Sequence, residues 1–315
     1  MKTDAVLPED LRRSVLAVPP LARSADQQID AAQNAAIINH LDAGGVSTLM
    51  YGGNANIYNL AVSELPALCE MLIEQAGPSS WVIPSVGADF GKADDQLRLL
   101  RGYPFPTAML LPLSFPATPK GVATGIRRLA DRYGKPLIAY VKFENYLTPE
   151  HIAALLADGA VCAVKYAIVR DDPSDDPFLA ELVDLAGTDR IISGIGERPV
   201  IDHFQTFGLC AFTSGSVCVA PALTDAIRRA LLDGDVDAAA ELRAHFLDLE
   251  DLRDAHSPLR VLHEAVRLAG IGETGPMLPF LDGFDDAGLV ERIALAARDL
   301  AEKNAAALEA RSAAQ

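Results

Sequence analysis

Short, mostly apolar segments alternate with longer amphipathic ones along the first 233 residues, and this alternation restricts the chain to few folds. The short segments are rich in β-branched residues and have no polar face, which predicts buried strands. Eight of them occur, at 14–18, 47–51, 81–85, 107–111, 137–140, 161–165, 191–193 and 209–213. Apolar residues at helical spacing lie between them, for example at 28–41, 62–75, 120–133, 149–156, 177–185 and 201–207. Strands of this kind, each followed by a helix, are typical of a parallel sheet covered by helices.

Two α/β architectures satisfy this pattern, and the first turn favours one of them. A doubly wound open sheet usually has a glycine-rich phosphate loop after its first strand. Here the first strand runs into Pro19-Pro20-Leu21, which cannot form such a loop. Eight strand–helix units between residues 12 and 233 have the usual length of a (β/α)8 TIM barrel, so we predict that fold.

After Pro221 the pattern is helical only, with helices expected at 223–232, 236–249, 259–268 and 287–307. We therefore predict two parts: a barrel that carries the active site, residues 1–233, and a helical extension packed on it, residues 234–315.

The charge balance excludes several kinds of partner. The 315 residues include 43 acidic and 27 basic side chains, a formal net charge of −16, which repels nucleic acid and anionic lipid. No apolar run reaches the roughly 18 residues of a membrane span, and the polar start MKTDAVLPEDLRR is unlike a signal peptide. The four cysteines form no CxxC pair. We expect a cytoplasmic protein with a small-molecule ligand.

Two reactive side chains stand at the ends of neighbouring predicted strands, where a barrel carries its chemistry. Lys165 ends the sixth strand, and desolvation there would lower the pKa of its amine and make it a nucleophile toward carbonyls. Tyr140 ends the fifth strand, and its phenol could carry protons. At such a position, a lysine that is ion-paired or reaches solvent is more common than a nucleophilic one. A tyrosine that only packs its ring is as common there as one that carries protons.

A third candidate is the turn Tyr51-Gly-Gly-Asn-Ala-Asn after the second strand. Glycine lets the backbone approach a ligand closely, and consecutive amides that lead into a helix N-terminus form a pocket for a carboxylate. We expect Gly53 and Asn54 in that pocket. A tight turn in which Asn56 or Asn59 caps the next helix accounts for the same residues without a ligand.

Together these positions resemble the dihydrodipicolinate synthase/N-acetylneuraminate lyase family, Schiff-base (class I) aldolases and dehydratases on a (β/α)8 barrel. The resemblance covers residues 14–300 and is strongest in the spacing of Tyr140 and Lys165. The Gly-Gly-Asn-Ala-Asn turn stands where the family has a glycine–threonine motif that holds the substrate's carboxylate. Ile192-Ser-Gly-Ile-Gly-Glu197 is similar to a loop that lines the family's pocket, which places Gly194 there. Residues 209–216, which include Ser214, resemble the eighth-strand segment.

The resemblance implies that Lys165 forms an imine with a 2-oxo acid such as pyruvate, while Tyr140 moves protons. It implies that Gly53 and Asn54 hold the carboxylate. It also implies a homo-oligomer, a tetramer or a dimer, because family members are commonly tetramers. No cofactor is expected, and six scattered histidines without a His-x-His or His-Glu-x-x-His motif give no support for a metal site.

Several departures argue against dihydrodipicolinate synthase itself. Many members carry two relay threonines where this chain has Gly53 and Asn54. The tyrosine that a neighbouring subunit usually lends after the fourth strand is absent. Asn145 stands where the synthases have an arginine that holds the second substrate's carboxylate, and we retain it as a substrate-binding candidate. The proton path then needs another donor, with four candidates: Tyr58, Thr213, Ser214 or a water.

We predict a Schiff-base lyase or aldolase acting on a 2-oxo acid. A dehydratase of sugar acids that uses the same lysine is one alternative, because Gly-Gly followed by a polar residue and the Lys142…Asn145 pattern are similar to the 5-dehydro-4-deoxyglucarate dehydratase branch. A relative that binds a 2-oxo acid or sugar acid without turnover is the other. We interpret the run 241–250 and the arginines 253, 260 and 267 as solvated helix faces or subunit contacts.

Overall fold

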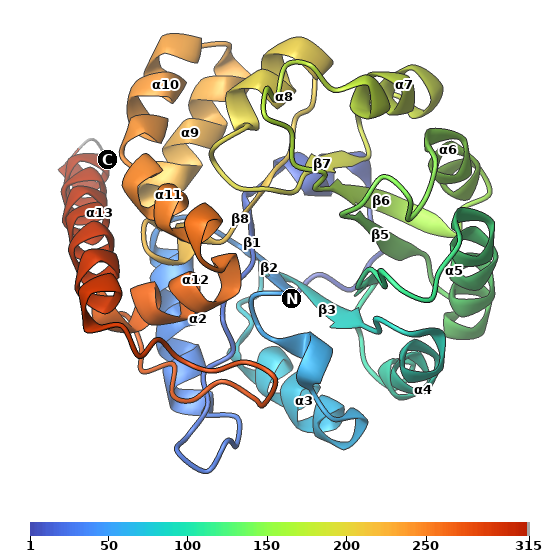
Figure 1. Ribbon diagram of the computed structural model, residues 1–315, viewed down its shortest axis with the longest axis horizontal. Coiled ribbons are helices and arrows are strands. Elements are labelled where there is room, and N and C mark those ends of the chain that lie inside the picture. The colour runs from blue at the N-terminus through green and yellow to red at the C-terminus, as the bar shows by residue number, and fades with distance from the viewer. Residues whose placement is uncertain (314–315) are drawn as a thin grey trace.

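The computed structural model, which describes residues 1–313, contains one barrel of parallel strands (Figure 1). The strands are β1 (Leu16–Ala17), β2 (Thr48–Tyr51), β3 (Trp81–Val86), β4 (Ala108–Leu110), β5 (Leu137–Val141), β6 (Val161–Tyr166), β7 (Ile191–Ser193) and β8 (Thr213–Ser214). They pair in the order β7-β6-β5-β4-β3-β2-β1-β8. A parallel bridge between Ser193 and Phe212 joins β7 to the segment before β8. The predicted (β/α)8 barrel is confirmed.

The eighth strand differs most from its predicted range, because it begins at Thr213 rather than at residue 209. The preceding helix ends with Gly208 in the left-handed conformation, at φ 69°. The backbone amide of Leu209 then donates to the carbonyl of His203 at 3.1 Å. This helix-ending turn uses the residues that the hydrophobic pattern assigned to the strand.

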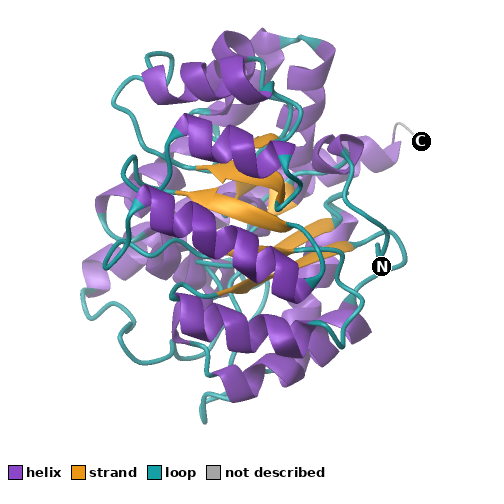
Figure 2. Cartoon of the chain, turned by 90° about the vertical axis from the view of Figure 1, so that its right-hand side faces the viewer, coloured by secondary structure: helices purple, strands orange, loops and turns teal. Residues whose placement is uncertain are grey.

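A ring of helices surrounds the strands (Figures 1 and 2). These are α2 (Ala31–Ala43), α3 (Leu65–Gln75), α4 (Phe90–Leu100), α5 (Pro119–Tyr133), α6 (Pro149–Ala157), α7 (Pro177–Ala186), α8 (Val200–Phe207) and α9 (Pro221–Asp233). Every residue of β2, β3 and β5 is buried. Both faces of the strands are therefore covered, which explains why the sequences of these strands are continuous apolar runs.

Five of the ring helices begin at a side-chain cap on the rim where the strands end. In each, an Asp or Thr oxygen accepts a hydrogen bond from the backbone amide three residues later, which satisfies one of the unpaired first-turn amides. The caps are Asp30, Asp89, Thr118, Thr148 and Asp176. They fix the start of the helix that follows each loop of the rim.

The opposite rim is covered by the N-terminal segment, which includes α1 (Pro8–Arg12). The Lys2 amide donates to the Ser80 carbonyl, just before β3, at 2.7 Å. Arg228 of α9 donates to the Arg12 carbonyl at 3.1 Å. This rim is thereby filled by the chain itself, and the carboxyl rim is the one available to a ligand.

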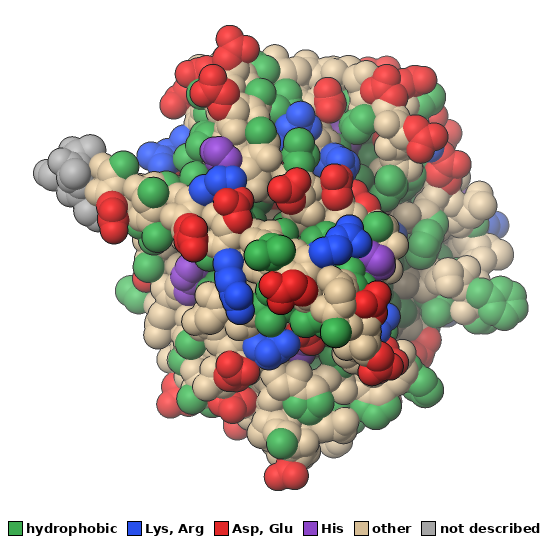
Figure 3. Space-filling view, turned by 60° about the vertical axis from the view of Figure 1, so that its left-hand side comes forward, with side chains coloured by type: hydrophobic (Ala, Val, Ile, Leu, Met, Phe, Trp, Pro, Cys, Tyr) green, Lys and Arg blue, Asp and Glu red, His purple; other side chains and the backbone are tan. Residues whose placement is uncertain are grey.

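The helical extension consists of α10 (Val236–Ala244), α11 (Leu247–Ala255), α12 (Pro258–Leu268) and α13 (Ala287–Ala313). The single helix predicted at 236–249 was wrong: tight turns at His245 and Phe246 end α10, and Phe246 is fully buried there. Helix α13 packs along α9, α11 and α12. Figure 3 shows acidic side chains spread over this side of the molecule, with basic ones among them.

The extension also caps a barrel helix. Helix α9 starts with Pro221, and its N-cap Ala220 has no side-chain oxygen. The Asn304 Oδ1 of α13 accepts hydrogen bonds from the amides of Ala222, at 2.8 Å, and Leu223, at 3.4 Å. Asn304 is buried, so water cannot replace it in the folded chain.

We expect Asn304→Ala to lower the free energy of unfolding by about 1–3 kcal/mol, because it leaves two buried amides without an acceptor. Urea denaturation measures this change. Glu302→Ala, at an exposed position of the same helix, is the control and should change stability little. Equal stability of the two variants would contradict the capping role.

Candidate active site

A cavity of about 280 Å³ opens at the carboxyl rim of the barrel. Its walls come from residues that follow β1, β2, β5, β6, β7 and β8, together with residues 253–259 of α11, α12 and the turn between them. Three of the predicted substrate-binding residues, Gly53, Asn54 and Gly194, line the cavity together with the two proposed catalytic residues, Tyr140 and Lys165. The rim therefore collects the groups that the sequence placed at separate strand ends.

Lys165 and Tyr140 are neighbours at the centre of this cavity. The two residues are paired in register between β6 and β5. The Lys165 Nζ lies 4.5 Å from the centroid of the Tyr140 ring. Lys165 is 5% exposed and Tyr140 is 9% exposed. A buried amine and a buried phenol thus face the same small space.

The Lys165 amine has the electrostatic surroundings of a nucleophile. Burial, together with the nearby charges of Lys142 and Arg253, lowers its pKa to about 7. Among the residues that the structure describes, no carboxylate forms an ion pair with Lys165. The interpretation of Lys165 as an ion-paired structural lysine therefore does not apply.

The Tyr140 phenol has the opposite shift. Burial raises its pKa to about 12, while the charge of Arg253 acts in the other direction. The hydroxyl therefore keeps its proton at neutral pH. The protonated phenol can donate a hydrogen bond, whereas the neutral amine of Lys165 can accept one.

The turn after β2 is built differently from the predicted one. Gly53 and Asn54 line the cavity, and the Asn54 Nδ2 donates to the Val18 carbonyl at 3.0 Å. The turn continues into a single turn of 3₁₀ helix, Ile57–Asn59, and α3 begins only at Leu65. The expected α-helix N-terminus beside Gly53 is therefore wrong. Neither Asn56 nor Asn59 caps a helix; Asn59 Nδ2 donates to Asn56 Oδ1 at 2.8 Å.

Gly194 is required by close packing against the lysine. A Cβ at this position would lie 2.8 Å from the Lys165 Cγ and 2.6 Å from the Tyr166 carbonyl oxygen. The Gly194 amide also donates to that same carbonyl at 2.6 Å. The glycine lets the loop after β7 lie directly against the stem of Lys165.

Ser214 and Asn145 lie outside the cavity lining. Ser214 is buried, and its hydroxyl donates to Glu197 Oε1 at 2.5 Å and accepts from the Val217 amide at 2.8 Å. Asn145 is exposed on the loop after β5. Of the other relay candidates, Tyr58 and Thr213 do line the cavity.

Arg253 is a cavity residue that the sequence analysis assigned to a solvated helix face. It is only 7% exposed and lies against the ends of β7 and β8. Its Nη1 pairs with Glu250, which is 2% exposed, and donates to Ser216 Oγ at 3.2 Å. The solvated interpretation of these two residues was wrong, because α11 turns this face onto the barrel rim. An i,i+3 charge pair is equally typical of an exposed helix, so the sequence carried no signal for it.

A second buried carboxylate lies behind Arg253. Burial and the charge of Glu250 raise the pKa of Glu197 to about 8. Glu197 Oε1 accepts from the Ser214 and Thr224 hydroxyls, at 2.5 Å and 3.3 Å. A proton held on Glu197 at neutral pH lets two acidic residues share this interior region.

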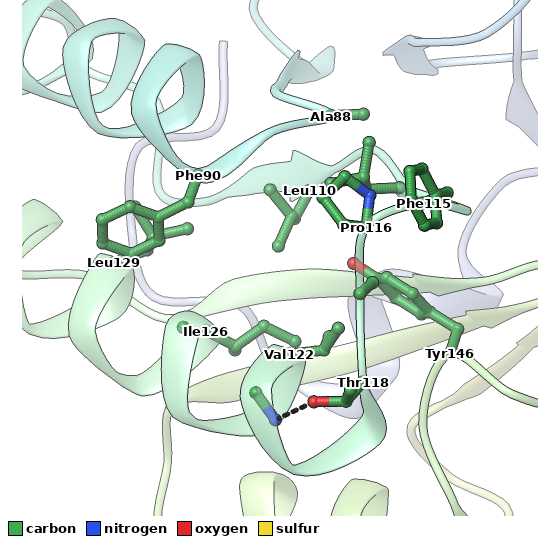
Figure 4. Close-up of a pocket in the computed structure, with 14 residues that line it drawn as sticks. Ala88, Phe90, Leu110, Phe115, Pro116, Thr118, Val122, Ile126, Leu129 and Tyr146 are labelled. Carbon is green, nitrogen blue, oxygen red and sulfur yellow. Dashed lines mark hydrogen bonds between the residues drawn. The ribbon is translucent and has the colours of Figure 1, made fainter.

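A larger cavity, of about 540 Å³, lies between α4 and α5 and the loop before α5 (Figure 4). Its wall is apolar, with Phe90, Leu110 and Val122 among the lining residues, and Phe115 is 83% exposed at its edge. It holds no Lys, Arg, His, Asp or Glu side chain. The titratable chemistry of this rim therefore lies in the smaller cavity.

In the part of the chain that the structure describes, no group of three or more His, Cys, Asp or Glu side chains could hold a metal ion. No helix within residues 1–313 is long and apolar enough to cross a membrane.

The comparisons with known proteins place the fold. No protein-family model matches the chain, and no curated protein sequence matches it. Solved structures do match. Dihydrodipicolinate synthase from Agrobacterium tumefaciens str. C58 superposes with a TM-score of 0.82 at 18% identity, over 93% of this chain and 99% of that one. The Bacillus clausii enzyme gives 0.81 at 19% identity, over 91% and 97%.

A further match has a bound small molecule. YagE, a prophage protein of the dihydrodipicolinic acid synthase family from E. coli K12, was solved in complex with pyruvate. It gives a TM-score of 0.76 at 19% identity and covers 92% of this chain and 98% of that one. These matches confirm the predicted resemblance at the level of the fold, and identities of 16–19% agree with a divergent chain.

The Lys165 amine should become reactive near pH 7. We expect acetylation of Lys165 by acetic anhydride to rise with a midpoint at about pH 7, because the neutral amine is the nucleophile. Peptide mass spectrometry across a pH series measures the midpoint. Lys142→Met should raise it, since removing a like charge makes protonation of Lys165 easier. Lys120→Met, on the exposed side of α5, is the control; a wild-type midpoint near 10.5 would contradict the assigned surroundings.

Proposed function

We propose that this protein is a Schiff-base-forming lyase or aldolase that acts on a 2-oxo acid through Lys165. The observation that carries the proposal is the buried, unpaired amine with a pKa of about 7 next to the Tyr140 phenol. The fold shared with dihydrodipicolinate synthases, and the pyruvate bound to YagE, support the choice of a 2-oxo acid.

The chemistry begins with imine formation. The neutral Nζ adds to C2 of the 2-oxo acid, the carbonyl oxygen takes up a proton, and the resulting carbinolamine loses water to give a protonated imine. The C4 hydroxyl then gives its proton to a base and becomes an aldehyde carbonyl while the bond between C3 and C4 breaks, and the imine nitrogen accepts the released electron pair, which leaves an enamine. In the reverse direction, the enamine attacks an aldehyde carbon and forms the same bond.

Tyr140 is the proposed proton carrier. Its raised pKa of about 12 keeps the phenol protonated, so it can give a proton to the carbonyl oxygen and later to the leaving hydroxyl. Regaining that proton requires a further donor. Tyr58 and Thr213 line the cavity and are better placed for this role than the buried Ser214, whose hydroxyl proton is held by Glu197.

The carboxylate of the 2-oxo acid is assigned to Gly53 and Asn54. Both line the cavity after β2, and Gly53 leaves its backbone open to a close approach. Gly194 shapes the wall beside the imine. Asn145 is kept only as a contact for a substrate that extends past the rim, because it lies outside the lining.

A sugar-acid dehydratase is the second candidate function. In that reaction, the imine lets a base remove a proton from C3, and the enamine then expels the C4 hydroxyl as water. The observation that favours it is Lys142 at the mouth of the cavity, beside Tyr140 and in reach of a longer substrate. A relative that binds such acids without turnover is the remaining alternative.

Organisation and location remain predictions. We retain the division into a barrel of residues 1–233 and a helical extension of residues 234–315, a cytoplasmic location and a homo-oligomer. The exposed Phe115 and the apolar cavity beside it support self-association (Figure 4).

Imine formation can be trapped directly. Incubation with pyruvate and sodium borohydride should add a reduced pyruvyl group to Lys165, and peptide mass spectrometry locates it. Lys165→Ala should abolish the adduct and keep the fold, whereas Lys120→Ala should leave it unchanged. Absence of an adduct with pyruvate and with a panel of 2-oxo sugar acids would reject both enzyme functions. Turnover of an aldol or a sugar acid then separates the two enzymes from an inert imine-former.

Tyr140→Phe should lower turnover by about 10²–10⁴-fold, the usual range for a positioned proton carrier. The ring stays in place, so the Lys165 pKa should move little. Steady-state kinetics with a substrate identified by trapping measures the loss. Tyr103→Phe, which removes a hydroxyl between α4 and β4, is the matched control. Unchanged turnover would make Tyr140 only a wall of the cavity.

A further inference from the structure

We propose that the substrate is a 2-oxo acid with a second anionic group, and that Arg253 and Lys142 bind its two charged ends on either side of Lys165. This inference rests on the proposed function, because it assumes that the ketone lies at Lys165. It adds a residue of the helical extension to the binding site and defines the class of the substrate.

The cavity gathers basic side chains. Four charged side chains line it: Lys142, Lys165, Arg253 and Asp254. The only acidic one, Asp254, already pairs with Arg198 outside, at 2.8 Å from Nε to Oδ2. Three cationic groups therefore face one small space in a chain of net charge −16. Like charges gathered in one cavity repel one another unless an anion lies between them.

The guanidinium of Arg253 is only partly paired. Glu250 and Ser216 take the Nη1 group of the guanidinium. Its Nε is buried and has no hydrogen-bond partner among residues 1–313. Its Nη2 lies 2.9 Å from the position that a Cβ of Gly215 would occupy. The edge formed by Nε and Nη2 is the edge on which arginine binds a carboxylate with two parallel hydrogen bonds.

That edge lies beside the turn already assigned to the carboxylate. The Asn54 Nδ2 is 2.8 Å from the same Gly215 position, so the amide and the guanidinium are neighbours. Gly215 has no side chain to separate them. Arg253 thus supplies, next to Gly53 and Asn54, a charge for the carboxylate attached to the ketone carbon.

Lys142 stands across the cavity from this group. It follows β5, whereas Arg253 contacts the ends of β7 and β8, and Lys165 on β6 lies between them in the strand order. No carboxylate pairs with Lys142 within residues 1–313, and partial desolvation lowers the pKa of its amine. The second cation therefore fits a second anionic group at the distal end of the substrate.

The size of the cavity agrees with a longer acid. A volume of about 280 Å³ holds on the order of nine waters at the roughly 30 Å³ that each occupies in the liquid. That is more space than a three-carbon acid fills.

Two probes separate the roles of the cations. 2-Oxoglutarate and 2-oxopentanoate share a five-carbon backbone, and only the first has a distal carboxylate. The half-saturating concentration for borohydride trapping on Lys165 is measured for both at one pH. We expect the wild type to prefer 2-oxoglutarate by about tenfold or more, the usual effect of one hydrogen-bonded charge pair. The ratio of the two values cancels any change in the reactivity of the amine itself.

Two variants then test which cation binds which end of the substrate. Lys142→Met should remove the preference, so that the two acids are trapped alike, whereas Arg253→Lys should weaken both acids by a similar factor and keep their ratio. Arg253→Lys keeps a cation for Glu250, which guards against unfolding, and Lys120→Met is the control. An equal response of the wild type to both acids, or an unchanged ratio in Lys142→Met, would overturn the inference.

Failure of the proposed function gives a different result. If neither acid is trapped on Lys165, the imine chemistry is wrong, and calorimetric binding of glutarate and pentanoate then tests the anion site without any ketone. Tighter binding of glutarate that is lost in Lys142→Met would support the two-cation site alone. Equal binding of both, or no binding of either, would reject the site as well.

Discussion

All eight strands run in one direction, and closing them into a barrel brings eight carboxyl ends to a single rim. Everything at the candidate site depends on this constraint. Residues far apart in sequence, from Gly53 to Thr213, become walls of one cavity. The other rim is covered by the N-terminal segment, and the helix caps on the carboxyl rim hold its loops in place.

The sequence predicted those features that depend on local period and strand order. Tyr140 and Lys165 were found because each ends an apolar strand, and consecutive parallel strands align such ends. The turn after β2 was predicted only in part. Its glycines indicated a turn, but they did not indicate the 3₁₀ helix that follows. Arg253 and Glu250 were missed because their burial depends on how α11 docks, which no local pattern encodes. Buried and exposed i,i+3 charge pairs look alike in sequence.

Positive and negative side chains lie at different depths in the candidate site. Cationic groups line the cavity, whereas the carboxylates of Glu250 and Glu197 lie behind Arg253, bonded to Ser216, Ser214 and Thr224. The acids stabilise the guanidinium without neutralising the surface that a ligand meets. Protonation of Glu197 limits the repulsion between the two acids. Lys165 therefore experiences positive neighbours and little compensating negative charge, which keeps its amine available.

The position of Arg253 on α11 has an evolutionary consequence. The lysine and the tyrosine belong to strands whose registers are locked by the whole barrel, so few substitutions there are tolerated. The guanidinium that faces them comes from a helix appended after the barrel closes. A lineage can thus alter the charge that faces the cavity by drift in the appended helices while Lys165 and Tyr140 are inherited unchanged. Selection on the guanidinium and selection on the lysine–tyrosine pair then act on separate stretches of the gene.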